Sequence, residues 1–219
     1  MFQFALLLLG SFICGSIPFG LIISKIFYSI DIRELGSKNI GSTNVYRILG
    51  WKAGISVQIL DVLKGFIPVF LLSFLGAEFY LFNSFIGTKL AIGLLAVLGH
   101  IFSPFVSFKG GKGINTILGM LIGVSPIDIS ITFLGFVLVF LSTGIISVSS
   151  MSAAVLLPII VSVRYFSSPY ELREFVILVC TSILVTTIVF LTHRANIKRL
   201  REGTESSFEK FNLLKKVFK

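Results

Sequence analysis

Residues 129–163 read ISITFLGFVLVFLSTGIISVSSMSAAVLLPIIVSV, thirty-five consecutive positions without a charged side chain. One helix over this stretch would be roughly 52 Å long at 1.5 Å per residue, whereas bilayer hydrocarbon is about 30 Å thick. The stretch therefore has to be divided. Breaks are offered by Ser142-Thr143-Gly144, by the polar run from Ser147 to Ser152 and, further upstream, by Ser125-Pro126. We expect short helices at 113–124, 127–142 and 146–163.

The rest of the chain has the same apolar character. Of its 219 residues, 55% are hydrophobic and 13% are charged, and the mean hydropathy is +0.98. A soluble domain usually carries about 25% charged residues. The composition therefore predicts an integral membrane protein and argues against a soluble enzyme, a disordered segment and a nucleic-acid-binding domain.

Four further apolar stretches complete the predicted bundle. They cover residues 1–24, 53–77, 85–105 and 174–192. The second contains Asp61 and Lys64, three residues apart on one helical face, where they can pair. We expect an all-α polytopic membrane protein, a compact bundle of about seven transmembrane helices. Five helices plus short re-entrant helices are the alternative.

The distribution of basic residues predicts the orientation. With the N-terminus outside, the cytoplasmic segments hold fifteen Lys and Arg and the external ones three. Because basic residues accumulate in cytoplasmic loops, the N-terminus is expected outside and the C-terminus in the cytoplasm. We expect one transmembrane domain over residues 1–205. Residues 206–219 form a basic tail, either an amphipathic surface helix or a frayed end.

This orientation places three polar segments on the cytoplasmic side. The first, residues 35–47, reads LGSKNIGSTNVYR and is dense in small hydrogen-bonding residues. Asn44 and Arg47 are three apart and could share a helical face. By composition alone, a solvated turn capped by Asn and Ser explains the segment equally well.

The second polar segment combines GHIFSPF at 99–105 with FKGGKGINT at 108–116. Glycines interleaved with lysines can present backbone N–H groups to an anion, and a helix beginning after Gly113 would add its positive end. Lys112 is followed by glycine rather than Ser or Thr, so this is not a Walker A loop. A flexible loop whose lysines only set topology is the alternative, and His100 alone is more often structural.

The third polar segment, residues 193–205, reads HRANIKRLREGTE. A basic patch that stops translocation explains its Arg and Lys, but not His193, Asn196 and Leu200, which share one helical face. Together the three segments predict a site for a phosphorylated substrate at the inner leaflet. The residues alone leave an enzyme, a transporter or channel, and a structural membrane subunit open.

Metal and disulfide chemistry are not predicted. The chain has two histidines, far apart, and acidic residues near them are few. Its two cysteines, Cys14 and Cys180, lie in separate apolar stretches, where we expect both to be buried as small hydrophobes.

The three segments resemble the motifs of the bacterial acyl-phosphate-dependent glycerol-3-phosphate acyltransferase family. Those motifs are roughly G-S-G-N-P-G-A-T-N-x-x-R, G-H-x-F-P-x-(F/Y)-x-x-F-K-G-G-K-G-x-A-T and H-R-x-N-I-x-R-L-x-x-G-x-E, and all three occur here in order. The chain departs from them at Lys38 (usually Gly), Ile40 (usually Pro), Ser42 (commonly Ala), Ser103 (commonly Pro) and Asn115 (commonly Ala).

The resemblance implies a reaction and its partners. Acyl phosphate and sn-glycerol 3-phosphate would give 1-acyl-glycerol 3-phosphate and phosphate, the first acylation of phospholipid synthesis. No cofactor and no metal are implied. A separate cytosolic phosphate acyltransferase would supply the acyl phosphate. The enzyme would be a multi-pass protein of the bacterial plasma membrane, in contact with membrane lipid and without a nucleic-acid partner.

The resemblance also implies roles for individual residues. The glycerol 3-phosphate would be held and its hydroxyl oriented by Ser37, Arg47, Lys112, His193 and Asn196. The acyl phosphate would be held by Lys109 and by the backbone at Gly110, Gly111 and Gly113. The pocket would be shaped by Asn39, Gly41, Thr43, Asn44 and His100. Ser147 or Ser150 would add a hydrogen bond, and Glu205 would pair with a basic residue rather than react.

Overall fold

The structure of the chain, a computed structural model, describes residues 2–75, 79–167 and 171–208, and within these ranges every regular element is a helix. It separates into two compact units, unit 1 (Met1–Val124) and unit 2 (Ser125–Lys219), which are described one at a time.

The described residues of unit 1 form seven α-helices. Their bounds are α1 Phe2–Ser16, α2 Phe19–Tyr28, α3 Ser42–Leu49, α4 Trp51–Ile67, α5 Ser73–Leu75, α6 Phe85–Ile101 and α7 Ile114–Val124. A π-helical turn, η2 (Pro68–Leu72), joins α4 to α5, and short 3₁₀ turns lie at η1 (Ile32–Glu34), η3 (Leu81–Asn83) and η4 (Pro104–Val106). Unit 2 contains α8 Pro126–Thr143, α9 Ile146–Arg164, the 3₁₀ turn η5 Tyr165–Ser167, α10 Leu172–Thr192 and α11 Arg194–Arg201.

Six helical segments of the described chain are long and apolar enough to cross a membrane. They are Phe2–Tyr28, Trp51–Leu75, Phe85–Val106, Pro126–Thr143, Ile146–Ser167 and Leu172–Thr192. The apolar helix α7 has eleven residues and rises roughly 17 Å, too little to span the hydrocarbon alone. The predicted helices at 113–124, 127–142 and 146–163 all form, and Gly144 ends α8 in the left-handed conformation with φ +71°.

The first predicted span, residues 1–24, is interrupted in the structure. The absence of charged residues over this stretch gave no indication of the break. Helix α1 ends at Ser16 and α2 begins at Phe19, with Pro18 between them. Proline has no N–H to donate and disfavours a helical residue before it, so the break falls there. The Lys64 Nζ on α4 donates to the carbonyl of Ile17 at 2.7 Å and satisfies part of the broken backbone.

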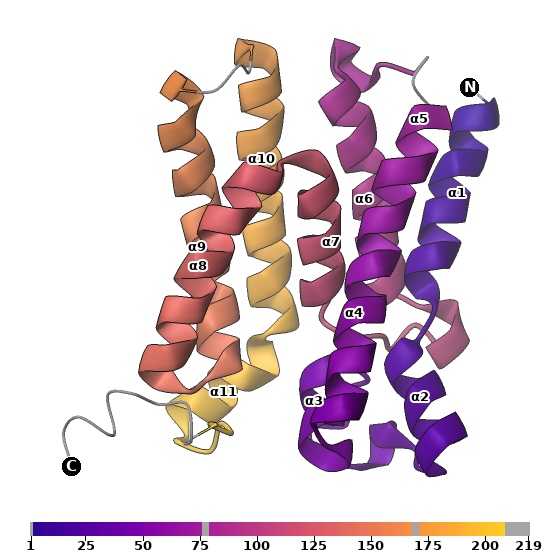
Figure 1. Cartoon of the computed structure of the whole chain (residues 1–219), viewed down its shortest axis with the longest axis vertical. Coiled ribbons are helices and arrows are strands. Elements are labelled where there is room, and N and C mark those ends of the chain that lie inside the picture. The colour runs from indigo at the N-terminus through magenta and orange to yellow at the C-terminus, as the bar shows by residue number, and fades with distance from the viewer. Residues whose placement is uncertain (1, 76–78, 168–170, 209–219) are drawn as a thin grey trace. The chain divides into compact units, whose positions relative to one another are not determined.

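The helices of unit 1 pack closely through glycine. Helix α6 packs against α1 and α7, and α4 packs along α7 (Figure 1). A Cβ at Gly65 of α4 would collide with the carbonyl of Thr116 on α7, and a Cβ at Gly119 of α7 with the carbonyl of Val62 on α4. Such small residues let two membrane helices approach closely enough for their backbones to touch.

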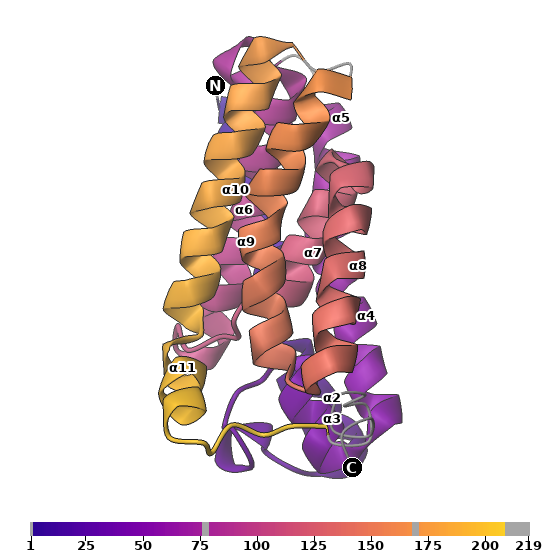
Figure 2. The same cartoon turned by 90° about the vertical axis from the view of Figure 1, so that its left-hand side faces the viewer.

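Unit 2 is built around α9, which packs against both α8 and α10 (Figure 2). An ion pair joins the start of α8 to the end of α9, with 2.9 Å between Asp128 Oδ1 and Arg164 Nη1. Helix α11 follows α10 directly at His193. Its chain then continues to Phe208, whose N–H donates to the carbonyl of Gly144 at 2.8 Å.

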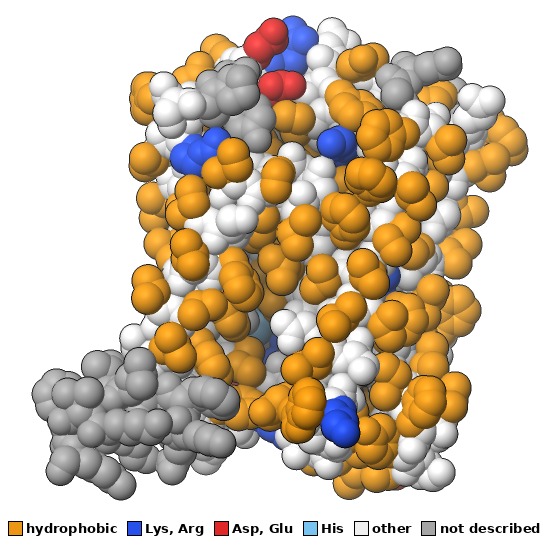
Figure 3. Space-filling model, viewed as in Figure 1, with side chains coloured by type: hydrophobic (Ala, Val, Ile, Leu, Met, Phe, Trp, Pro, Cys, Tyr) orange, Lys and Arg blue, Asp and Glu red, His pale blue; other side chains and the backbone are white. Residues whose placement is uncertain are grey.

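The outward faces of the long helices are mostly apolar, and orange side chains cover most of the face in view in Figure 3. This agrees with lipid rather than water as their surroundings. Cys180 on α10 is exposed on such a face, so its predicted burial is wrong, whereas Cys14 is half-buried. The predicted tail helix over 206–219 lies largely outside the described residues.

Candidate active site

The three polar segments form two local clusters, one in each unit. Residues 35–47 and 99–116 belong to unit 1, and residues 193–205 belong to unit 2.

Asn44 organises the first segment from its centre. Its side chain is 2% exposed. The amide Nδ2 donates to the carbonyls of Ile32, Leu35 and Asn39 at 3.3, 3.0 and 2.9 Å, and Oδ1 accepts from the Ser37 N–H at 2.9 Å. One amide therefore fixes the loop from 32 to 39 onto α3.

The loop held by Asn44 exposes polar groups at its outer edge. Ser37 and Lys38 are exposed, and Arg47 on α3 is half-buried. Asn39 Oδ1 accepts from the Gly41 N–H at 2.9 Å and so stabilises a local turn that leads into α3. Thr43, in the first turn of α3, is half-buried. Lys38 has φ +58°, a conformation that disfavours side chains with a Cβ and explains why glycine suits this position.

The second segment forms a glycine-rich loop before α7. The N–H groups of Gly110 and Gly111 donate back to the carbonyls of Ile101 and His100 at 3.0 and 3.1 Å, and so fold the loop onto the end of α6. Gly113 has φ +83° and stands directly before α7. The loop therefore ends at a helix N-terminus, whose free N–H groups favour an anion.

Two lysines flank these glycines. Lys109 is exposed and Lys112 is half-buried. We call residues 109–113 the phosphate loop, because its cations and the following helix N-terminus are the groups that bind phosphate in proteins.

The structure brings the first two segments into contact. Asn115 Nδ2, in the first turn of α7, donates to Ser42 Oγ at the start of α3 at 2.9 Å. Both residues are departures from the family pattern, and here they bond to each other. The phosphate loop and the Ser37–Arg47 segment thus belong to one cluster in unit 1.

His100 lies buried behind the phosphate loop, near the predicted Asp61–Lys64 pair. The pair is present, with 2.8 Å between Lys64 Nζ and Asp61 Oδ1. The same carboxylate oxygen lies 3.8 Å from His100 Nδ1. The ion pair between Asp61 and Lys64 was predicted from their spacing. The approach of His100 to Asp61 was not predicted, because this contact joins two helices that are far apart in sequence.

In unit 2, Glu205 ties the third segment to α9. Its carboxylate accepts from Asn196 Nδ2 at 2.7 Å, from Arg199 Nε at 2.6 Å and from Ser147 Oγ at 2.9 Å. Burial raises the pKa of this carboxyl, but the hydrogen bonds from Asn196, Arg199 and Ser147 outweigh burial and hold the pKa below its usual value. Glu205 therefore pairs with a basic residue.

His193 and Asn196 are both buried on the inner face of the α10–α11 junction. His193 Nδ1 lies 2.8 Å from the carbonyl oxygen of Val189. A carbonyl oxygen only accepts, so Nδ1 carries a proton, and in a neutral ring the lone pair is on Nε2. Of the two candidate serines on α9, Ser147 joins the Glu205 cluster, whereas Ser150 Oγ donates to Ile146 within the helix at 2.9 Å.

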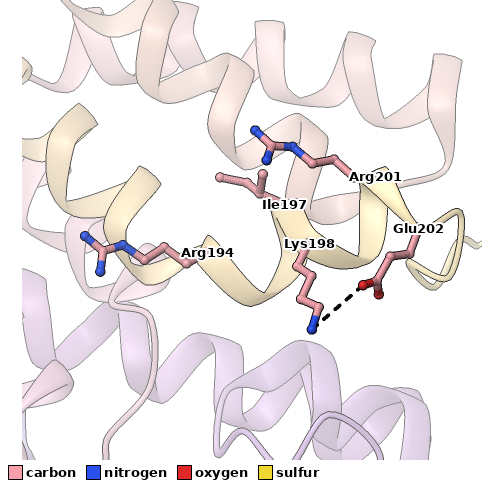
Figure 4. Close-up of a pocket in the computed structure, with 5 residues that line it drawn as sticks. All are labelled: Arg194, Ile197, Lys198, Arg201 and Glu202. Atoms are coloured by element: carbon pink, nitrogen blue, oxygen red, sulfur yellow. Dashed lines mark ion pairs between the residues drawn. The ribbon is translucent and has the colours of Figure 1, made fainter.

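The opposite face of α11 lines a pocket of about 340 Å³. Arg194, Ile197, Lys198, Arg201 and Glu202 surround it. Figure 4 shows that the three cationic side chains point in different directions. Lys198 forms an ion pair with Glu202, with 3.8 Å between Nζ and Oε1. The three cationic side chains do not converge on one point as ligands of a phosphate would. In the ranges described, no three His, Cys, Asp or Glu side chains gather as metal ligands do.

Comparison with known proteins gives the same assignment along almost the whole chain. The glycerol-3-phosphate acyltransferase family model matches residues 5–203. Glycerol-3-phosphate acyltransferase 2 of Bacillus anthracis is 41% identical over 92% of this chain and 97% of its own. The enzyme of Fusobacterium nucleatum is 41% identical over 94% and 98%.

Solved structures agree. The crystal structure of PlsY (YgiH), an integral membrane glycerol 3-phosphate acyltransferase, in its glycerol 3-phosphate form is similar with a TM-score of 0.79. It is 35% identical over 94% of this chain and 95% of that one. Its lysophosphatidic acid form gives a TM-score of 0.78.

Proposed function

Because the chain belongs to the glycerol-3-phosphate acyltransferase family, we propose that it draws its acyl group from acyl phosphate. The protein is a multi-pass membrane enzyme that makes lysophosphatidic acid from glycerol 3-phosphate. The phosphate loop before α7 is the observation that supports acyl phosphate as the donor. A donor that has its own phosphate needs an anion-binding site in addition to the site that binds glycerol 3-phosphate.

The reaction needs positioning more than a strong base. The sn-1 hydroxyl oxygen attacks the acyl carbonyl carbon, the bond from that carbon to the phosphate oxygen breaks, and inorganic phosphate leaves. The hydroxyl proton passes to a phosphate oxygen of the substrates. Since a mixed anhydride is already activated, holding two anions together and offsetting their repulsion is the main task, and positioning supplies several kcal/mol of barrier reduction.

We infer the following roles for residues of unit 1. Lys109 and the backbone N–H groups that follow Gly113 at the start of α7 hold the acyl phosphate. The N–H groups of Gly110 and Gly111 already donate to the carbonyls of Ile101 and His100, so these two glycines shape the loop rather than bind the phosphate. The glycerol 3-phosphate is held by Ser37 and Arg47, with Lys112 between the two substrates' phosphates. The buried amide of Asn44 maintains the loop, together with Asn39, Gly41, Thr43 and His100.

Roles in unit 2 rest on the hydrogen bonds of the third segment. The lone pair on His193 Nε2 accepts a hydrogen bond from the substrate hydroxyl, and Asn196 orients the same group. Glu205 holds Asn196 and Arg199 in place. Ser150 has the weakest support, because its hydroxyl already bonds within α9.

The charge bias supports a topology. We place the N-terminus outside and the C-terminus in the cytoplasm, with α7 counted as the seventh, short helix. Residues 1–205 would act as one catalytic domain with the tail 206–219 on the membrane surface. The cytoplasmic side then receives acyl phosphate from a soluble phosphate acyltransferase, in the plasma membrane of a bacterium.

A donor test decides the proposal. Purified protein receives radiolabelled glycerol 3-phosphate with palmitoyl phosphate, palmitoyl-CoA or palmitoyl-acyl-carrier protein, each with EDTA. We expect lysophosphatidic acid from the acyl phosphate alone, unaffected by EDTA. Product only from a thioester donor would refute the assignment of the donor. No product, together with substrate uptake into proteoliposomes, would indicate a transporter.

Two substitutions test the residue roles. Lys112→Ala and Asn196→Ala should each lower kcat/KM at least 10²-fold, since several kcal/mol of transition-state stabilisation are lost. Lys216→Ala, in the tail, serves as a control and should be nearly silent. Equal and mild effects at all three positions would refute the roles.

A further inference from the structure

We propose that the buried Asp61–Lys64 pair positions the imidazole of His100, and that His100 in turn holds the phosphate loop in its binding conformation. Asp61 and Lys64 thereby become positioning residues of a reaction whose substrates they do not touch. The inference rests on the proposed function, since it assigns the control of the loop that would hold the acyl phosphate.

The pair lies deep inside unit 1. Asp61 and Lys64 of α4 are 1% and 3% exposed. Lys64 Nζ lies 2.8 Å from Asp61 Oδ1 and 2.7 Å from the carbonyl of Ile17 at the α1–α2 break. Two strong contacts therefore fix the ammonium group between α1 and α4, and the ammonium fixes the carboxylate.

The carboxylate faces His100. Asp61 Oδ1 lies 3.8 Å from His100 Nδ1, and His100 is 4% exposed. This is too long for a direct hydrogen bond. In a low-dielectric interior, however, a carboxylate at this distance favours an imidazole whose Nδ1 carries the proton. His100 Nε2, on the opposite side of the ring, then carries the lone pair.

The ring lies directly against the phosphate loop. A Cβ built on Gly111 would collide with His100 Nε2, and one on Gly110 with the carbonyl of His100. That carbonyl also accepts from the Gly111 N–H at 3.1 Å. The loop thus takes its shape from both the side chain and the backbone of His100, so a rotation of the ring has to displace Gly111.

A second anchor holds the same end of α6. Ser103 Oγ donates to the carbonyl of Ser16 at 2.6 Å, beside the α1–α2 break. The carbonyls of Ser16 and Ile17 therefore receive one bond from the segment that precedes the phosphate loop and one from Lys64. The carbonyls beside the helix break at Pro18 thus bond both to the Asp61–Lys64 pair, through Lys64, and to the segment before the phosphate loop, through Ser103.

Stability alone is a poor reason for such a pair. Replacing a buried ion pair by apolar residues of similar volume is often neutral or stabilising. Within a membrane span, charged residues are costly, and they mark functional positions. This distinction makes the inference testable, because a double apolar replacement can keep the fold while removing the control over His100.

The first measurement is spectroscopic. The chain has only two histidines, so ¹⁵N-histidine labelling gives two pairs of ring signals, which His193→Gln assigns. Wild-type protein should show His100 protonated at Nδ1. Asp61→Asn and the double variant D61L/K64M should shift the proton toward Nε2 and leave the His193 signals unchanged. An unchanged His100 signal would overturn the inference.

The second measurement is kinetic. In both variants, KM for palmitoyl phosphate should rise at least tenfold with a smaller change in kcat, because the loop binds less well while the reacting groups remain. Wild-type KM in D61L/K64M would show that the pair only supports the fold, and would overturn the inference. If Asp61→Asn fails to fold, the double variant alone decides.

A matched control separates this effect from the loss of any buried ion pair. Asp128 is 1% exposed and pairs with Arg164 in unit 2. Asp128→Asn should leave the His100 signals and the KM for the donor unchanged, and a KM rise equal to that of Asp61→Asn would count against the inference. If wild-type protein makes no product with acyl phosphate, the proposed donor is refuted. If wild-type protein is active and the Asp61 variants keep the wild-type KM and His100 signals, only the positioning role is refuted.

Discussion

Asn44 offers the sharpest test of how the first segment is held together. Its amide makes four hydrogen bonds, one accepted from Ser37 and three donated to the carbonyls of Ile32, Leu35 and Asn39. Each such bond contributes about 0.5–1.5 kcal/mol, and a buried group left without a partner costs about 1–3 kcal/mol.

The exposure of the partners sets the expected size of the effect. Ser37 and Leu35 are exposed and can turn to water, whereas Ile32 is fully buried. Asn44→Ala should therefore lower the free energy of unfolding by about 2–4 kcal/mol. Asn44→Asp should be at least as damaging, because it replaces the donating Nδ2 by an oxygen that faces three carbonyl oxygens.

Trp51 provides the readout. It is the single tryptophan and begins α4 directly after α3, so its fluorescence follows unfolding close to the substitution. Denaturant titrations in detergent would compare both variants with wild type and with Gln58→Ala, which removes an exposed amide. If Asn44→Asp matched wild type in stability and activity, the hydrogen-bond assignment would be refuted.

Three further substitutions follow from the structure. Gly111→Ala should reduce activity at least tenfold by displacing His100, whereas Gly10→Ala, where a Cβ meets nothing within 4 Å, should behave as wild type in the same assay. Lys38→Gly should raise the free energy of unfolding by about 0.5–1 kcal/mol in denaturant titrations, because it relieves a left-handed residue; a loss of stability would contradict that reading. The lowered pKa of Glu205 stabilises the folded protein fully above the ordinary pKa of 4.5, and this stabilisation is lost as pH falls through the folded-state pKa. Glu205→Gln should therefore flatten the acid side of a thermal-denaturation pH profile. An equally steep profile in the variant would contradict this role of the Glu205 carboxylate.

The helices could be predicted because lipid imposes a simple requirement. An apolar run must be about 20 residues long or be broken, and Gly144 and Pro126 stand where the breaks occur. The interruption at Pro18 was missed because the absence of charge says nothing of backbone continuity. The proline itself was the available signal.

The contacts of the site could be predicted only where they are local. Asp61 and Lys64 share a helical face, so their pairing followed from spacing. The approach of His100 to Asp61, the bond from Ser147 to Glu205 and that from Asn115 to Ser42 each join segments far apart along the chain. Such contacts depend on how helices pack, which no spacing in one sequence encodes.

The bond between Asn115 and Ser42 couples two positions that lie far apart along the chain. The motifs that this chain resembles carry alanine at both positions, and a chain with only one of the two polar residues has a polar group that lacks this partner. The two substitutions are therefore expected to show epistasis: reverting either one alone leaves a half-buried amide or hydroxyl without its bond, while reverting both restores an apolar contact.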